Sequence, residues 1–249
     1  MDQAKKYANL LDSFRSSTED ILLLERLEVS DKPIYVLDSS FNPPHFAHLG
    51  MCLSIPKGSQ LLLLLSITNA DKPVAPAAFN ERILMMEKLK TLIHNCTVSV
   101  AICKHALFVD KCRSISNKLG PREQVYLVGF DTLIRILDCK YYKEKAMQQV
   151  LQPFFSCSQI LCFSREVDGT TTDDQAQYLE KIKKSLLPNI PSQWSEKIKL
   201  TKLKGNVGFG VSSTRARQAI ISGDEETQRK IIPQEILNVI KVIQPYRHR

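Results

Sequence analysis

Residues 34–48 read IYVLDSSFNPPHFAH, and they contain an apolar run, a turn and the expected start of a helix. The run Ile34 to Leu37 is β-prone and lacks alternation, which is typical of a strand covered on both faces. Asn42-Pro43-Pro44 predicts a turn, because the proline rings fix the backbone. A helix is expected from about His45 to Ser54. Strand, turn and helix in this order indicate the beginning of a βαβ unit.

Further apolar runs alternate with helical segments along the rest of the chain. Strands are expected at 61–67, 97–102, 124–128, 159–163 and 197–203. Helices are expected at 79–94, at 173–187 and in the stretches that begin at Ser213 and Pro233. This alternation predicts an α/β fold, a Rossmann-like doubly wound parallel sheet with helices on both faces. Ligands of such sheets bind at the carboxyl ends of the strands, here near Asp38 to His48 and Gly129 to Asp131.

The first thirty residues read as a helical extension that precedes the main fold. Leu10, Leu11 and Phe14 share one helical face. The sequence Ser17 to Asp20 resembles a cap that restarts a second helix at Ile21 to Leu24. No repeat or linker divides the remainder. We therefore expect one nucleotidyltransferase-type domain over 1–249, with the helical extension at 1–30 and the catalytic fold at 33–246.

Composition and charge limit the classes of protein to which the chain can belong, but they do not indicate a function. The net charge of +8 and the pI of about 9.1 favour anionic ligands, but scattered basic residues make nucleic acid an unfavoured partner. Seven cysteines, an odd number without C-x-x-C spacing, suit reduced thiols in a cytoplasmic protein, with the nucleus left open. No signal peptide or membrane-length apolar run is recognised. We expect a soluble protein with no membrane partner.

His45 and His48 are the first candidate site residues. They lie three residues apart in the expected first helical turn, where free backbone N–H groups and the helix dipole attract phosphate. Two other interpretations stay open at this point. The pair and Cys52, one turn further on, have the spacing of a zinc site. The two histidines are also compatible with an ordinary surface or capping role.

A second candidate is the stretch Val211 to Arg217, which follows the glycine-rich segment 205–210. Its hydroxyl groups alone predict no more than a helix N-cap. Combined with Arg215 and Arg217 at a helix start, they also describe a phosphate-binding clamp. The interpretation as a phosphate-binding clamp is better supported when the two motifs are considered together.

Together the two motifs resemble those of the nicotinamide mononucleotide adenylyltransferase family. Ser40-Phe41-Asn42-Pro43 with His45 and His48 is similar to its G-[ST]-F-[DN]-P-x-[HT]-x-x-H signature, and Val211 to Arg217 is similar to its I-S-S-T-x-[IV]-R motif. The family's G-x-D, a helical arginine and a loop lysine correspond to Gly129 with Asp131, Arg82 and Lys72. The resemblance covers about residues 33 to 246. In the sequence of its motifs the chain most resembles a fungal "promoter of filamentation" branch of adenylyltransferase-like proteins.

The resemblance implies that ATP and nicotinamide mononucleotide react to give NAD and pyrophosphate, with Mg²⁺ accompanying ATP. It implies catalytic roles for His45, His48 and Arg217. It places ATP and phosphate contacts on Ser40, Phe41, Lys72, Gly129, Asp131, Ser213 and Thr214, with Ser40 and Phe41 also bordering the acceptor. The mononucleotide pocket falls on Ser39, Tyr142 and Cys103, and no protein metal site is implied.

Three departures from the family pattern concern the acceptor. Ser39 replaces a glycine, and its side chain is expected to crowd the backbone approach to a ligand. Cys103 stands where eukaryotic members have a tryptophan that stacks on the nicotinamide ring. Tyr142 replaces the second tryptophan and either stacks on the ring or is an ordinary surface aromatic. Loss of one aromatic wall weakens a planar ligand by roughly 0.5–1.5 kcal/mol.

Other functions stay open beside the adenylyltransferase hypothesis. One is an ATP-binding protein whose transferase activity is weak or absent, and which hydrolyses ATP slowly or acts mainly through protein partners that the sequence does not name. Another is a relative with a different substrate, such as a cytidylyltransferase or a tRNA-charging-type domain. The short chain and the lack of an anticodon-binding region argue against the tRNA alternative.

Overall fold

A computed structural model describes residues 2–28, 30–68, 76–142, 146–164, 171–203 and 210–246. These residues contain one sheet of seven strands in the order β1-β4-β3-β2-β5-β6-β7. The pairs from β4 to β7 are parallel, and β1 alone is antiparallel, against β4. The strands are β1 (Ile21–Leu23), β2 (Ile34–Asp38), β3 (Gln60–Ser66), β4 (Thr97–Cys103), β5 (Gln124–Gly129), β6 (Ser158–Ser164) and β7 (Ile198–Lys202).

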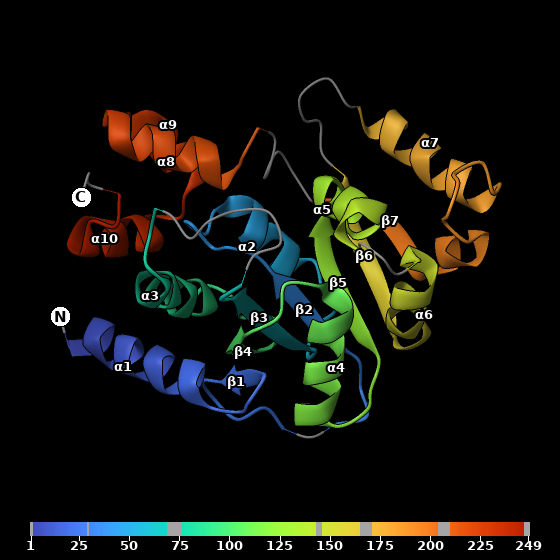
Figure 1. The fold of residues 1–249 in the computed structure, drawn as a ribbon. Helices are drawn as coiled ribbons and strands as arrows, with labels where there is room; N and C mark the ends of the chain where they lie inside the picture. The colour runs from blue at the N-terminus through green and yellow to red at the C-terminus, as the bar shows by residue number, and fades with distance from the viewer. Residues whose placement is uncertain are drawn as a thin grey trace.

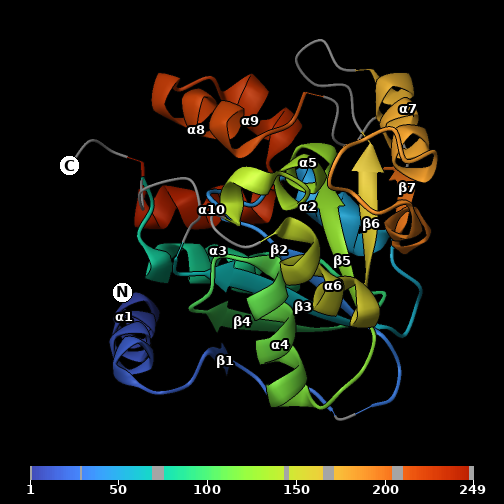
Figure 2. The ribbon, with the colours of Figure 1, turned by 45° about the vertical axis from the view of Figure 1, so that its right-hand side comes forward.

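Helices flank this sheet on two sides, as Figures 1 and 2 show. The α-helices are α1 (Asp2–Ser16), α2 (Phe46–Leu53), α3 (Phe79–Lys90), α4 (Phe108–Leu119), α5 (Phe130–Ile136), α6 (Met147–Cys157), α7 (Thr172–Lys183), α8 (Ser213–Ser222), α9 (Glu225–Ile231) and α10 (Gln234–Ile243). Two short 3-10 helices are η1 (Cys139–Tyr141) and η2 (Ser192–Lys197).

The leucines of β3 show why the sheet is covered on both faces. All five side chains from Leu61 to Leu65 are fully buried. Because side chains alternate along a strand, the odd-numbered leucines enter one core and the even-numbered ones the other. The first core includes side chains of α2, α3, α8 and α10, and the second includes those of α4, α5, α6 and α7. The expectation of a doubly wound α/β sheet is confirmed.

Strand β2 lies where the order of the sheet reverses. It pairs with β3 on one side and with β5 on the other. The chain builds β2, β3 and β4 outward in one direction, then returns and continues from β5 to β7 in the other. Helices that follow the two central strands leave on opposite faces, which opens a crevice at their carboxyl ends.

The prediction of a second helix at Ile21 to Leu24 is wrong. Ile21–Leu23 is the edge strand β1, and Ile21 pairs with Cys103. Ser17 does not restart a helix; its hydroxyl donates to the Phe14 carbonyl at 2.8 Å, where α1 ends. A run of four apolar residues has the same pattern in a strand and in a buried helix, so the available partner strand decides.

Other helices differ in extent from the expectation. α3 ends at Lys90 and α7 at Lys183, four residues before the expected ends. α4, α6 and α9 were not predicted. α6 contains Pro153, which is unfavourable inside a helix, and α9 has only seven residues. Within the described residues no helix is both long and apolar enough to cross a bilayer.

Candidate functional site

A cavity of about 490 Å³ opens at the carboxyl edge of the sheet, beside β2 and β5. The ends of these strands line it, together with the first turns of α2, α4, α5 and α8. Each of these helices begins at this edge because it follows a strand or a loop that ends there. Their free N–H groups and positive dipole ends therefore gather around one space, which favours an anion.

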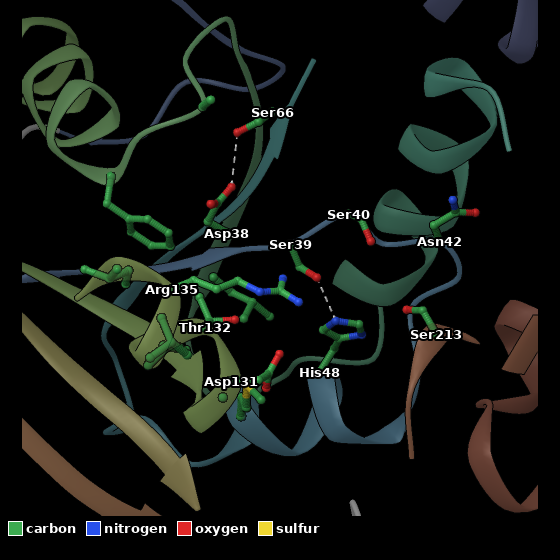
Figure 3. Close-up of a pocket in the computed structure, with 18 of the residues that line it drawn as sticks. Asp38, Ser39, Ser40, Asn42, His48, Ser66, Asp131, Thr132, Arg135 and Ser213 are labelled. Atoms are coloured by element: carbon green, nitrogen blue, oxygen red, sulfur yellow. Dashed lines mark hydrogen bonds between the residues drawn. The ribbon is translucent and has the colours of Figure 1, made fainter. Parts of the chain in front are cut away.

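The loop between β2 and α2 fixes the orientation of His48. Its Nδ1 accepts a hydrogen bond from the His45 backbone N–H at 3.2 Å, and its Nε2 lies 2.9 Å from the Ser39 hydroxyl (Figure 3). In a neutral ring an accepting Nδ1 leaves the proton on Nε2, which then donates to Ser39. The His45 ring stacks on His48 with centroids 3.8 Å apart. Both rings are buried, and both line the cavity.

Phe41 lies behind this loop and does not line the cavity. Its side chain is fully buried in the first core, with its ring 5.3 Å from that of His48. The backbone at Phe41 has φ of +45°, a region that bulky residues seldom adopt, and the buried ring holds it there. The expectation that Phe41 lines the ligand pocket is therefore corrected. Phe41 supports the loop, whereas Ser39 and Ser40 face the cavity (Figure 3).

The second motif forms hydrogen bonds to the loop of the first motif, although the two lie far apart in sequence. Ser213 donates through its hydroxyl to the Pro43 carbonyl at 3.0 Å, and Arg217 donates through Nη1 to the Asn42 carbonyl at 2.8 Å. Arg217 also donates to the Thr214 hydroxyl at 3.2 Å. The simple N-cap falls to Ser212, which accepts from the Arg215 N–H at 3.2 Å. Ser212, Ser213 and Thr214 all line the cavity, and Ser212 alone of the three is the N-cap of α8.

The exit of β5 contributes Gly129 and Asp131 to the cavity wall. A side chain at Gly129 would meet the Asp131 carboxylate, since a Cβ built there lies 2.9 Å from Oδ1. Glycine at this position therefore lets the carboxylate lie back against the strand end. Thr132 and Arg135, which were not predicted, line the same wall, and Figure 3 shows the Arg135 guanidinium reaching toward the centre of the cavity.

A buried ion pair that sequence reasoning missed lies at the inner end of the cavity. Lys111 on α4 forms a salt bridge with Asp38, and their side chains are 5% and 10% exposed. Ser66 donates to the other oxygen of Asp38 at 3.3 Å (Figure 3). Asp38 and Ser66 end neighbouring parallel strands, a signal that was available. Lys111 lies 73 residues from Asp38 in an unpredicted helix, and nothing in the sequence indicated the pair.

Basic side chains outnumber carboxylates around the cavity. Arg82, already a candidate, is 2% exposed, donates to the Ala77 carbonyl at 2.9 Å and lies 5.1 Å over the Phe79 ring. Burial lowers the pKa of Arg82, but an arginine remains charged at neutral pH. The lining contains four lysine or arginine side chains, Arg82, Lys111, Arg135 and Arg217, against two carboxylic ones, Asp38 and Asp131.

The residues predicted to contact the acceptor do not all line the cavity. Tyr142 lines the cavity and donates to the Ile136 carbonyl at 2.6 Å, and burial raises the pKa of its hydroxyl. Cys103 does not line the cavity; it is the last residue of β4, fully buried in the second core. Its place as an acceptor contact is therefore corrected. Phe108, at the start of α4, supplies an aromatic side chain that sequence reasoning missed.

Two further expectations concern Lys72 and Cys52. Lys72 lies outside the described residues. Cys52 is fully buried in the first core, one turn beyond His48, and does not line the cavity. Among the described residues, no three His, Cys, Asp or Glu side chains are grouped closely enough to hold a metal ion.

Known structures show the same fold, although no protein-family model matches the chain. Plasmodium falciparum nicotinic acid mononucleotide adenylyltransferase complexed with NaAD has a TM-score of 0.57 at 15% sequence identity, over 86% of this chain and 97% of that one. The same enzyme complexed with APC has a TM-score of 0.52 at 14% identity, with the same two coverages. At such identities the likeness shows the Rossmann-like fold of these proteins.

Proposed function

We propose that this chain is a nucleotidyltransferase that moves AMP from ATP to nicotinamide mononucleotide, forming NAD and releasing pyrophosphate. The observation that carries the proposal is the direct bonding of two phosphate-type motifs at one cavity. Ser213 and Arg217 hold the backbone of the loop that orients His48, although about 170 residues separate them in sequence. The structural neighbours bind NaAD and APC, which agrees with a nucleotide ligand.

The triphosphate is proposed to lie between the first turns of α2 and α8. Ser213 and Thr214, free N–H groups and Arg217 supply donors there, with Lys72 as a further expected contact. His45 and His48 face the α- and β-phosphates, and Gly129 with Asp131 faces a ribose. The mononucleotide phosphate is already a nucleophile, so no strong general base is needed. Catalysis rests on positioning and on neutralising charge at the α-phosphate and the leaving pyrophosphate.

Magnesium is proposed to enter with ATP. Mg²⁺ is commonly held by substrate phosphates, waters and one or two carboxylates. Asp38 is bonded to Lys111 and Ser66, so it is poorly suited to this role, whereas Asp131 stands on the cavity wall. These residues fit a cation that is bound mainly by phosphate oxygens, whose charge it neutralises.

The acceptor is proposed to lie against Tyr142 and Phe108, beyond Ser39. Two aromatic side chains can enclose a planar ring, even though Cys103 is not available. The nicotinamide assignment and the closeness to the fungal "promoter of filamentation" branch rest on the sequence motifs. A cytoplasmic location, with the nucleus open, and the low expectation for nucleic acid as a partner stay predictions.

A second function is favoured by one observation. The Ser39 hydroxyl engages Nε2 of His48, the ring atom that faces the cavity in the proposed transfer. In the proposed transfer Nε2 would have to give up this contact before it could donate to a phosphate, and that lowers the stabilisation it can offer. This contact favours the alternative of an ATP-binding protein whose transferase activity is weak.

Two histidine variants test the proposed function. His48→Ala is expected to reduce NAD formation from ATP and nicotinamide mononucleotide by about 100-fold, as loss of one phosphate contact in a transition state does. The matched control is His94→Ala, because His94 is exposed and does not line the cavity. Product is measured by chromatography, and thermal unfolding shows that both variants fold. Wild-type protein that binds ATP yet makes no dinucleotide with this or a related mononucleotide contradicts the proposal.

A further inference from the structure

Two cysteines from different helices touch on the side of the sheet covered by α4 and α6. The Sγ atoms of Cys112 and Cys157 lie 3.3 Å apart, although 45 residues separate them. Cys112 lies on α4, and Cys157 is the last residue of α6. These two helices pack against each other, as Figures 1 and 2 show. Neither cysteine lines the 490 Å³ cavity, and the proposed transfer uses neither.

We propose that Cys112 and Cys157 are a peroxide-sensitive thiol pair that closes reversibly into a disulfide between α4 and α6. A disulfide bond is about 2.05 Å long, so the two sulfur atoms need to approach by about 1.2 Å. A side-chain rotation at the end of a helix can supply a movement of this size. The Ser158 hydroxyl lies beside both sulfur atoms, at 3.2 and 3.8 Å, and does not separate them.

Exposure decides which sulfur reacts first. Cys157 is exposed and lines a second hollow of about 260 Å³, which admits a molecule as small as hydrogen peroxide. Cys112 is 3% exposed, and burial raises the pKa of its thiol to about 12. The buried thiol is therefore shielded from solvent oxidants and remains beside its partner as the resolving group.

The chemistry balances with one peroxide for each disulfide. The Cys157 thiolate attacks a peroxide oxygen, the O–O bond breaks, and the departing hydroxide takes a proton, leaving water and a sulfenic acid on Cys157. The sulfur of Cys112 then attacks that of Cys157. The S–S bond forms as the S–O bond breaks, and a second water leaves with the Cys112 proton. A dithiol such as dithiothreitol reverses the change by thiol–disulfide exchange.

The test treats the full-length reduced protein with hydrogen peroxide in slight molar excess. We expect its mass to fall by about 2 Da, corresponding to two lost hydrogens, and dithiothreitol to restore it. Digestion under non-reducing conditions is expected to yield one peptide pair that joins Cys112 to Cys157. Cys139→Ser is the matched control, because Cys139 is the other exposed cysteine among the described residues and contacts no sulfur there. This variant is expected to behave as the wild type.

Two further variants test the order of reaction. Cys157→Ser changes an exposed residue and is expected to abolish the loss of 2 Da. In Cys112→Ser, Cys157 is expected to accumulate as a sulfenic acid that dimedone traps, because its resolving partner is gone. The proposal is overturned if the wild type gains oxygen without losing two hydrogens. It is also overturned if the disulfide joins other cysteines, or if Cys157→Ser forms it as readily.

Discussion

At the scale of single residues, His48 is held from two sides. Its Nδ1 accepts from the His45 N–H and its Nε2 meets the Ser39 hydroxyl. In a neutral ring the first contact leaves the proton on Nε2, the atom that the proposed phosphate contact would use. The second occupies that same atom. Ser39 therefore competes with any ligand for the Nε2 proton, a consequence more specific than steric crowding.

Ser39→Ala tests this competition, because it removes the hydroxyl and keeps the Cβ. A neutral hydrogen bond contributes about 0.5–1.5 kcal/mol net, so freeing Nε2 is expected to raise ATP affinity by roughly 2- to 10-fold. Isothermal titration of ATP into both proteins measures the change. Ser222→Ala, which removes a serine hydroxyl away from the cavity, is the comparison. A lower affinity in Ser39→Ala would show that the hydroxyl itself binds the nucleotide or positions His48.

At the scale of single residues, the short motifs indicate polar side chains that line the cavity, but they do not indicate which apolar side chains are buried in a core. His45, His48, Ser213 and Arg217 are polar residues in short motifs, and all four line the cavity. Their catalytic and binding roles stay predictions. Phe41 and Cys103 also stand at loop and strand ends, but their side chains turn into the two cores. No local pattern distinguishes a side chain that faces the ligand from one that faces the core.

At the scale of elements, the start of α8 is tied to the loop that precedes α2. The Ser213 hydroxyl bonds to the Pro43 carbonyl, and the Arg217 guanidinium bonds to the Asn42 carbonyl. These contacts set the distance between two helix N-termini. The proposed binding of a triphosphate between the two helices depends on that distance.

Ser213→Ala is expected to weaken ATP binding more than it weakens the fold. Loss of the bond to Pro43 costs about 1 kcal/mol of stability, because Ser213 is partly exposed. The ATP dissociation constant is expected to rise by 10-fold or more, since a phosphate donor and the tie are lost together. The matched control is Ser222→Ala in the same helix, whose hydroxyl bonds to the Ala219 carbonyl away from the cavity. Equal loss of affinity in both variants would refute a specific role for Ser213.

A helix or strand could be predicted from sequence where its own residues show the pattern typical of that element. The five parallel strands after β2 are apolar and were expected within one or two residues. Edge strand β1 was not, because three apolar residues acquire their conformation only from pairing with β4. α6 was missed because Pro153 contradicts a helix locally, although Leu151, Phe154 and Phe155 bury its apolar face. Tertiary packing overrode propensity in both cases.

At the scale of the whole molecule, the two cores hold thiols and phenols that stay protonated when folded. Burial raises the pKa of Cys103 to about 11 and that of Cys162 to about 12, against an ordinary 9.0. It also raises the pKa of the Tyr126 and Tyr246 hydroxyls. Above pH 9 the unfolded chain releases these thiol protons while the folded chain keeps them. The folded state then binds more protons, so its stability falls as pH rises.

We therefore expect the free energy of unfolding to fall between pH 9 and 11. Each buried thiol contributes about 1.4 kcal/mol per pH unit over its window. Urea denaturation at pH 7.5, 9, 10 and 11, with a reductant present, measures the slope. Cys162→Ala is expected to reduce the slope by about one such contribution, even if the variant is less stable throughout. A stability that stays constant from pH 8 to 11 is incompatible with buried neutral thiols.

The whole-molecule arrangement also explains why the site forms at this edge. The reversal of strand order at β2 and β5 opens the crevice, helix N-termini surround it, and basic side chains outnumber carboxylates there. The alternating sequence pattern predicts a fold class in which the strand order reverses, but it does not show between which strands the reversal lies. The ion pair between Lys111 and Asp38 needs the actual packing of α4 against β2.

The fate of the α-phosphate of ATP tests the central claim most directly. The protein is incubated with Mg²⁺, nicotinamide mononucleotide and ATP labelled at the α-phosphate, and the products are separated. The proposed transfer puts the label into NAD, with one pyrophosphate released for each NAD formed. Label that stays in ATP, or that appears in ADP with release of inorganic phosphate, would contradict the transfer and favour a nucleotide-binding or ATPase function.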